Sequence, residues 1–311
     1  SASLHVVYLK LLLMNFSPVV TLAVLGIIWF LIWICKHKNA NLEEKPRVTH
    51  KVIVGLIASY VIIFFLLHPF IVRYNFSLFS CRELGDGHAY LTRDTSIVCW
   101  SDEHYKYALG VALPGIFLWV VGSPILAVYM LYHSREHLSN PDSVAKFGFL
   151  YKGFKQEYYY WEMYIVFRKV CLIMVAVFLY NVNRVFQALV FFAVALAAYR
   201  IHDLHEPYMT RALNALEVRS LGVALITIYC GLYFLTDAVN ETLRIFLFWL
   251  LVLANAYFFF YWLLKVFEGV PHHLKHHHPK FYTKLKCFRR FNPQSNDPGS
   301  FRETQFDGRK T

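Results

Sequence analysis

Seven apolar stretches, each close to the length of a membrane-spanning helix, occupy most of this chain of 311 residues. A helix needs about 20 residues to cross a hydrocarbon layer about 30 Å thick. The stretches are residues 18–35, 52–72, 107–131, 161–180, 185–199, 218–236 and 245–264. Hydrophobic residues make up 57% of the chain, against about 45–50% in typical soluble domains. We therefore expect an all-α, polytopic membrane protein with seven transmembrane helices.

The basic residues of the connections are distributed unevenly between the two sides of the membrane. If residue 1 lies outside, 22 Lys and Arg fall on one side and seven on the other. The positive-inside rule then predicts an extracellular N-terminus and a cytosolic C-terminus. The net charge of +11 is not spread over one face as on a nucleic-acid-binding surface, so we expect no nucleic acid as partner, and the basic tail favours the anionic inner leaflet instead.

The sequence divides into three parts. Residues 1–17 have helical apolar spacing and are too few to span, so we expect an outer juxtamembrane helix. Residues 18–264 form the transmembrane domain, and a second interfacial helix precedes its fourth span. Residues 265–311 form a basic cytosolic tail, partly disordered. Because the chain begins with Ser and shows no signal peptide, we expect a processed or excised C-terminal piece of a longer protein.

The outer connection of residues 73–106 is the one large enough to fold on itself. It contains Cys81 and Cys99, and an oxidising compartment there favours a disulfide between them. Asn75 and Asn240 begin N-x-S/T sequons on the same side and are candidate glycosylation sites. The other cysteines fall in spans or on the cytosolic side and are interpreted as free thiols: Cys35, Cys171, Cys230 and Cys287.

The tail carries a basic amphipathic stretch suited to an anionic membrane surface. Its basic residues are Lys280, Lys284, Lys286, Arg289 and Arg290. Cys287 lies among them and is a candidate for palmitoylation. The histidine run at residues 272–278 has no fixed geometry for ligation, so we expect no metal site.

Charged residues inside the fourth span are the strongest candidates for a functional site. Glu162 and Lys169 are seven residues apart and share a helix face, with Arg168 beside them. Charges at this depth face a bundle interior or a wet cavity. One interpretation is an ion path, a gate or a lipid-headgroup site. The other is internal pairing with Glu162 or Glu217 that fixes helix packing.

Helix breakers occur in the second and third spans. They are His68-Pro69, Pro114 and Gly122-Ser123-Pro124, which indicate either hinges or simple kinks. Phosphate-binding loops and the HExxH, GxSxG and CxxC motifs do not occur, so we expect no enzyme, no catalytic residue and no cofactor.

Several strings resemble a known family. They include Phe79-Ser80-Cys81, Cys99-Trp100-Ser101-Asp102, Tyr160-Trp161-Glu162 with Arg168-Lys169, and Glu206-Pro207-Tyr208. The region from about Leu9 to Leu264 resembles the TRP-like carboxyl-terminal membrane domain of large surface proteins of single-celled eukaryotes. The ectodomains of those proteins carry cysteine-rich, growth-factor-receptor-like repeats. The resemblance implies a channel-like bundle that follows an extracellular portion.

Three functions are compatible with these observations. The first is a TRP-like domain that anchors or transduces for an extracellular portion and conducts cations. The second is a seven-helix receptor coupled to cytosolic partners, and the third is a structural anchor in a surface or ciliary assembly. Each places the chain in the plasma membrane or the ciliary membrane, with other surface subunits or further copies of itself as partners.

Overall fold

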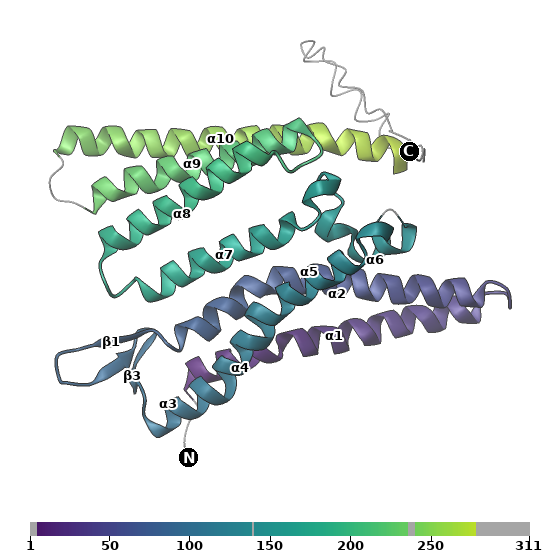
Figure 1. Cartoon of the computed structure of the whole chain (residues 1–311), viewed down its shortest axis with the longest axis horizontal. Coiled ribbons are helices and arrows are strands. Elements are labelled where there is room, and N and C mark those ends of the chain that lie inside the picture. The colour runs from purple at the N-terminus through teal and green to yellow at the C-terminus, as the bar shows by residue number, and fades with distance from the viewer. Residues whose placement is uncertain (1–4, 139, 236–239, 278–311) are drawn as a thin grey trace, which may run out of the picture. The chain divides into compact units, whose positions relative to one another are not determined.

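The computed structural model describes residues 5–138, 140–235 and 240–277 (Figure 1). Contacts divide the chain into two units, Ser1–Asn255 and Ala256–Thr311. The helix α10 (Glu241–His277) begins in the first unit and continues into the second.

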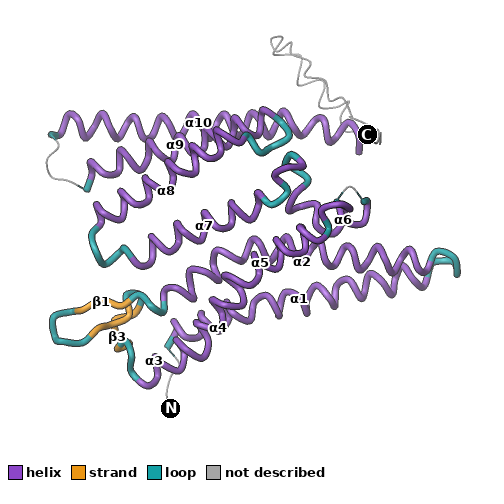
Figure 2. Tube along the Cα trace, in the orientation of Figure 1, coloured by secondary structure: helices purple, strands orange, loops and turns teal. Residues whose placement is uncertain are grey.

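Helices make up most of the described residues, as Figure 2 shows. The α-helices of the first unit, in chain order, are α1 (Val6–Lys38), α2 (Lys45–Ser77), α3 (Asp102–Tyr107), α4 (Leu113–Gly115), α5 (Ser123–His133), α6 (Pro141–Tyr151), α7 (Trp161–Phe178), α8 (Arg184–His205) and α9 (Arg211–Phe234). Short 3-10 turns, η3 (Arg135–His137) and η4 (Gln156–Tyr158), flank α6. The all-α expectation is confirmed.

Within the described residues, six helices are long and apolar enough to cross a membrane. They are α1, α2, the continuous helix Asp102–His133, α8, α9 and α10, and they cover six of the seven expected stretches. The remaining stretch forms α7, but its 18 residues include three charges, Glu162, Arg168 and Lys169. The hydrophobicity of α7 is therefore not enough by itself to identify it as a membrane-spanning helix.

The helix α1 joins two elements that the sequence suggested were separate. An outer helix was expected over residues 1–17 and a span from Pro18, whereas one helix runs from Val6 to Lys38. Pro18 removes the N–H that would bond Met14 O, and Ser17 Oγ donates to that carbonyl at 2.7 Å. A helix of 33 residues is about 50 Å long, so α1 extends beyond the hydrocarbon layer.

The helix Asp102–His133 contains two π-helical segments, η1 (Ala108–Ala112) and η2 (Ile116–Gly122). The second ends two residues before Pro124, which cannot donate to a preceding carbonyl. His68 Nε2 of α2 lies 3.2 Å from Trp119 O, and Ser123 Oγ also donates to Trp119 O. Neighbouring side chains thus bond the backbone where the helix departs from α geometry.

The outer connection folds into a three-stranded antiparallel sheet. The strands β1 (Cys81–Glu83), β2 (Ala89–Leu91) and β3 (Asp94–Val98) lie in the order β1-β2-β3. Cys81 pairs with Leu91 in the first ladder, and Tyr90 pairs with Val98 in the second. Figure 2 shows these strands beside the beginning of α3.

An apolar cluster fastens this sheet to the N-terminal end of α1. Tyr8 and Leu11 of α1 are buried with Leu91 and Ile97 of the sheet. The Tyr8 and Tyr107 rings stack with centroids 4.0 Å apart. The first turns of α1, the sheet and α3 therefore form one packed cap, which we call the disulfide cap.

Candidate functional site

The charged residues of α7 form an interhelical ion pair. Arg168 Nη2 lies 2.9 Å from Glu217 Oε1 of α9, and the two side chains are 15% and 21% exposed. A shielded charge is costly unless a partner of opposite sign sits close to it. The pair therefore ties α7 to α9 and offsets much of the cost of placing Arg168 within an apolar helix.

Glu162 and Lys169 differ from that pair. Glu162 is partly buried, whereas Lys169 is exposed on the isolated chain. Lys169 lies near both Glu162 and His68 of α2. The expected common face of α7 is thus present. It leaves Lys169 accessible to water, lipid headgroups or another subunit.

A cluster of aromatic and histidine rings surrounds the N-terminal end of α7. Trp161 is 4% exposed and lies 6.0 Å, between ring centroids, from His202 of α8, which is 1% exposed. Tyr208 stacks on Phe154 at 4.9 Å and lies 5.6 Å from His202. Trp161 Nε1 and His202 Nε2 are buried and have no protein hydrogen-bond partner. Two of the buried polar atoms without a partner in the described residues therefore lie at this end of α7.

Two loops are joined beside this cluster. Lys155 N–H donates to Pro207 O at 2.8 Å, and Met209 N–H donates to Gly153 O at 3.1 Å. Asn214 brackets Tyr208: its Oδ1 accepts from Tyr208 N–H at 2.9 Å and its Nδ2 donates to Tyr208 O at 3.0 Å. The connection from α6 to α7 is therefore fixed to the connection from α8 to α9.

The environment of Tyr208 keeps its hydroxyl protonated. Burial, followed by the carboxylates of Glu217 and Glu162, raises the pKa of Tyr208 to about 12. Tyr208 lies in the joined loop between α8 and α9, near enough to the Glu217 carboxylate for that charge to act on its pKa. We call this assembly of Trp161, Arg168, His202, Tyr208 and Glu217 the polar joint.

The expected disulfide is present, because Cys81 and Cys99 are bonded across the sheet. His104, which is fully buried, completes the disulfide cap: its Nδ1 accepts from Trp100 N–H at 3.2 Å, and its Nε2 lies 3.0 Å from Leu78 O. The cysteines that remain free in the described residues are Cys35, Cys171 and Cys230. The bond and the histidine together hold the sheet onto the ends of α2 and α3.

Asn75, one of the two candidate glycosylation sites, lies in a contact between two helices. Its side chain has no exposed surface, and its Nδ2 donates to Ile71 O at 2.8 Å. Asn15 Nδ2 of α1 donates to Asn75 Oδ1 at 3.1 Å, so the expected glycan site is an interhelical contact. Asn240 is exposed and caps α10 by accepting from Leu243 N–H at 2.9 Å. A glycan at Asn240 stays a prediction.

Some predicted sites lie outside the described residues. They are the basic stretch with Lys280, Lys284, Lys286, Arg289 and Arg290, and the lipidation candidate Cys287.

The roles of His202 and His104 and the contact between Asn15 and Asn75 were not predicted from the sequence. His202, Asn15 and Asn75 are polar residues within apolar helices, which is the same signal that identified Arg168, whereas His104 lies in the polar helix α3. Their partners come from distant helices or from backbone carbonyls, so the pairing itself had no sequence signature.

Comparison with known proteins gives one informative match. The chain is 29% identical over 203 residues to "Cysteine repeat modular protein A" of Toxoplasma gondii, which covers 60% of this chain and 6% of that protein. The chain thus spans a small part of the length of this relative. No family model and no solved structure match the chain. The match fits the expected link to cysteine-rich proteins of single-celled eukaryotes, while the TRP-like assignment receives no support.

Proposed function

We propose that this chain is a seven-helix membrane domain that anchors an extracellular, cysteine-repeat portion at the plasma membrane or ciliary membrane. The match to Cysteine repeat modular protein A carries the proposal, because a segment rich in membrane-length helices corresponds to 6% of a long modular protein. The remaining length of such a protein lies beyond the matched segment. No catalytic role is proposed.

The disulfide cap supports an extracellular N-terminus. A disulfide persists in an oxidising compartment, and Cys81 and Cys99 pack in the same cluster as Tyr8 and Leu11 of α1. The hairpin at the other end of α1 and α2 carries Lys36, Lys38 and Lys45, as expected of a cytosolic connection. The disulfide and the basic hairpin thus both favour an orientation with the N-terminus outside.

The ion pair supports counting α7 as a membrane-spanning helix in addition to the six apolar ones. Arg168 is compensated by Glu217, so α7 can cross the membrane if that pair faces α9 rather than lipid. Seven crossings also place the two termini on opposite sides. An extracellular portion would then precede α1, while the basic tail would meet the inner leaflet.

Anchoring can be tested by a fusion experiment. A secreted, monomeric reporter with its own signal sequence is joined to residue 1, and the fusion is expressed in cultured cells. We expect antibody on intact cells to detect the reporter and a C-terminal tag to become detectable after permeabilisation. Reporter released into the medium, or reporter accessible only after permeabilisation, would refute the proposal.

A transducing or conducting role is the second candidate, and Lys169 together with the π-helical segment η2 favours it. Mid-helix π segments often occur at functional sites, and Lys169 is an exposed basic residue near His68, which bonds the backbone of η2. Whole-cell currents should then change in Lys169→Ala at unchanged surface amount. Equal background currents in cells with and without the protein would exclude conduction and leave anchoring.

A further inference from the structure

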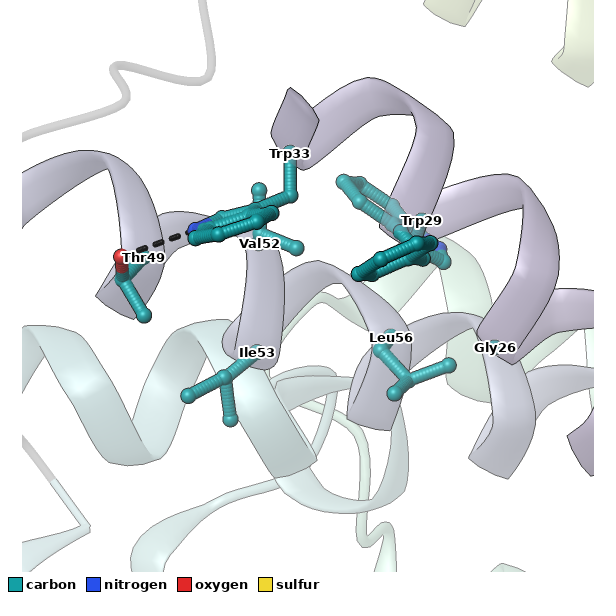
Figure 3. Close-up of a pocket in the computed structure, with 8 residues that line it drawn as sticks. Gly26, Trp29, Trp33, Thr49, Val52, Ile53 and Leu56 are labelled. Carbon is teal, nitrogen blue, oxygen red and sulfur yellow. Dashed lines mark hydrogen bonds between the residues drawn. The ribbon is translucent and has the colours of Figure 1, made fainter. Parts of the chain in front are cut away.

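An apolar groove of about 310 Å³ separates α1 and α2 near the hairpin that joins them. Figure 3 shows its lining, with Trp29 and Trp33 from α1 facing Val52, Ile53 and Leu56 from α2. Gly26 forms one end, where a Cβ would meet no atom within 4 Å. The groove is therefore an unfilled space between two otherwise closely paired helices.

One end of the groove is closed by a polar contact. Trp33 Nε1 donates to Thr49 Oγ1 at 3.0 Å, which Figure 3 marks with a dashed line. An indole whose ring lines apolar space while its N–H bonds a polar group suits the boundary between hydrocarbon and headgroups. The groove thus starts at the expected level of the membrane interface and continues toward Gly26, into the hydrocarbon.

Basic side chains lie one helical turn beyond this closed end. Lys36 and His37 follow Trp33 by three and four residues, and Lys45 precedes Thr49 by four, so each shares a helix face with a groove residue. The segment 36–51 contains five Lys and Arg, against the two acids Glu43 and Glu44. Positive charge therefore gathers where the groove meets the interface.

We propose that this groove binds one anionic phospholipid of the adjacent leaflet. An acyl chain occupies the space along Trp29 and Leu56, and the phosphate lies among Lys36 and Lys45. The apolar wall matches the chain, the basic rim matches the phosphate, and the Trp33–Thr49 contact separates the two. The site is specific to the hairpin of α1 and α2 and is independent of the basic tail.

The test uses tryptophan quenching in nanodiscs. The purified chain is reconstituted in phosphatidylcholine with a minor fraction of either phosphatidylserine or phosphatidylcholine whose acyl chains are brominated. Bromine quenches an indole on contact, so we expect phosphatidylserine to quench several-fold more strongly at equal mole fraction. The excess should disappear in Trp29→Phe/Trp33→Phe, which assigns it to the groove among the seven tryptophans of the chain.

Two variants and one control complete the design. Gly26→Leu adds a side chain to the groove wall and should remove the excess quenching, while Lys36→Gln/Lys45→Gln should reduce it several-fold by weakening phosphate binding. Gly231→Leu is the control, because Gly231 of α9 also has no neighbour within 4 Å of a Cβ. The lysine variant changes the exposed Lys36 and the half-buried Lys45 and leaves the apolar lining intact, so it tests the proposal even if Gly26→Leu fails to fold.

Three outcomes would overturn the proposal. The first is equal quenching by the two brominated lipids, which would reduce the groove to ordinary bilayer contact. The second is unchanged excess quenching in a folded Gly26→Leu protein. The third is a change of oligomeric state in Gly26→Leu without any lipid preference in the parent, which would assign the groove to a second copy of the chain.

Discussion

At the scale of single residues, the central observation is that the charged and polar groups of α7, α8 and α9 are unequally satisfied. Arg168 has Glu217, whereas His202 Nε2 and Trp161 Nε1 lack protein partners. A buried polar atom without a partner costs about 1–3 kcal/mol. The polar joint therefore contains both a stabilising ion pair and two buried polar atoms without a protein partner.

Removing Arg168 should destabilise the protein strongly. Arg168→Ala leaves Glu217 as an unpaired, largely shielded charge, which costs about 3 kcal/mol or more. Arg200→Ala is the matched control, because Arg200 is 61% exposed and 3.9 Å from Asp203, a pair worth about 0–1 kcal/mol. Thermal unfolding in detergent should separate the two, and Arg168→Ala/Glu217→Ala should be milder than the sum of its single changes. Additive single changes would show that the pair does not interact.

The phenol of Tyr208 should make the protein sensitive to alkali. Its pKa is raised from an ordinary value of 10.0 to about 12, so the folded state holds this proton more tightly than the unfolded state. The associated stability is complete below pH 10 and is lost as the pH rises toward about 12. Unfolding temperatures measured over this range should fall less steeply in Tyr208→Phe than in the parent. Identical slopes would contradict the assigned environment.

At the scale of elements, the long helices remain continuous because side chains form hydrogen bonds with backbone carbonyls near the prolines. Ser17 bonds the carbonyl freed by Pro18, and His68 and Ser123 bond Trp119 O in η2. These contacts allow α1 and the helix Asp102–His133 to continue through prolines. The breakers of the sequence thus produce local departures within helices rather than helix ends.

The contact of α1, α2 and α4 should be sensitive to one added methyl group. A Cβ at Gly115 would overlap Asn15 Oδ1 and Asn75 Oδ1, so Gly115→Ala must separate the helices or break their hydrogen bond. We expect a loss of about 1–3 kcal/mol. Gly110→Ala, in the same helix but with no neighbour within 4 Å, should be neutral or slightly stabilising. Denaturation of the two variants in detergent gives the comparison, and equal stability would exclude the packing argument.

At the scale of the whole molecule, the proposed orientation places opposite ends of the helices in different compartments. Val182 lies in the turn between α7 and α8 and is 66% exposed, while Leu42 lies in the turn between α1 and α2 and is 84% exposed. The proposal puts Val182 outside and Leu42 in the cytosol.

Single cysteines at these positions test the orientation. In a background with Cys35, Cys171, Cys230 and Cys287 changed to alanine, an impermeant thiol reagent on intact cells should label Val182→Cys. Leu42→Cys should react only after permeabilisation, because the basic hairpin favours the cytosol. The reverse labelling pattern would show that the orientation is inverted. Labelling of both Val182→Cys and Leu42→Cys on intact cells would show that the two turns lie on the same side, which contradicts an odd number of membrane crossings between residues 42 and 182.

The sequence by itself determined the helical class, six of the membrane-length helices and the disulfide between Cys81 and Cys99. These features follow from local hydrophobicity and from cysteines on one loop, both of which are readable along the chain. The burial of Asn75 was missed because it depends on Asn15 of another helix. The continuity of α1 was missed because Pro18 usually ends a helix, whereas here Ser17 Oγ bonds the carbonyl that Pro18 leaves free. Only the tertiary structure decided that Arg168 pairs with Glu217 and that Asn75 is a helix contact, since side chains separated by 49 and 60 residues meet only after the helices pack.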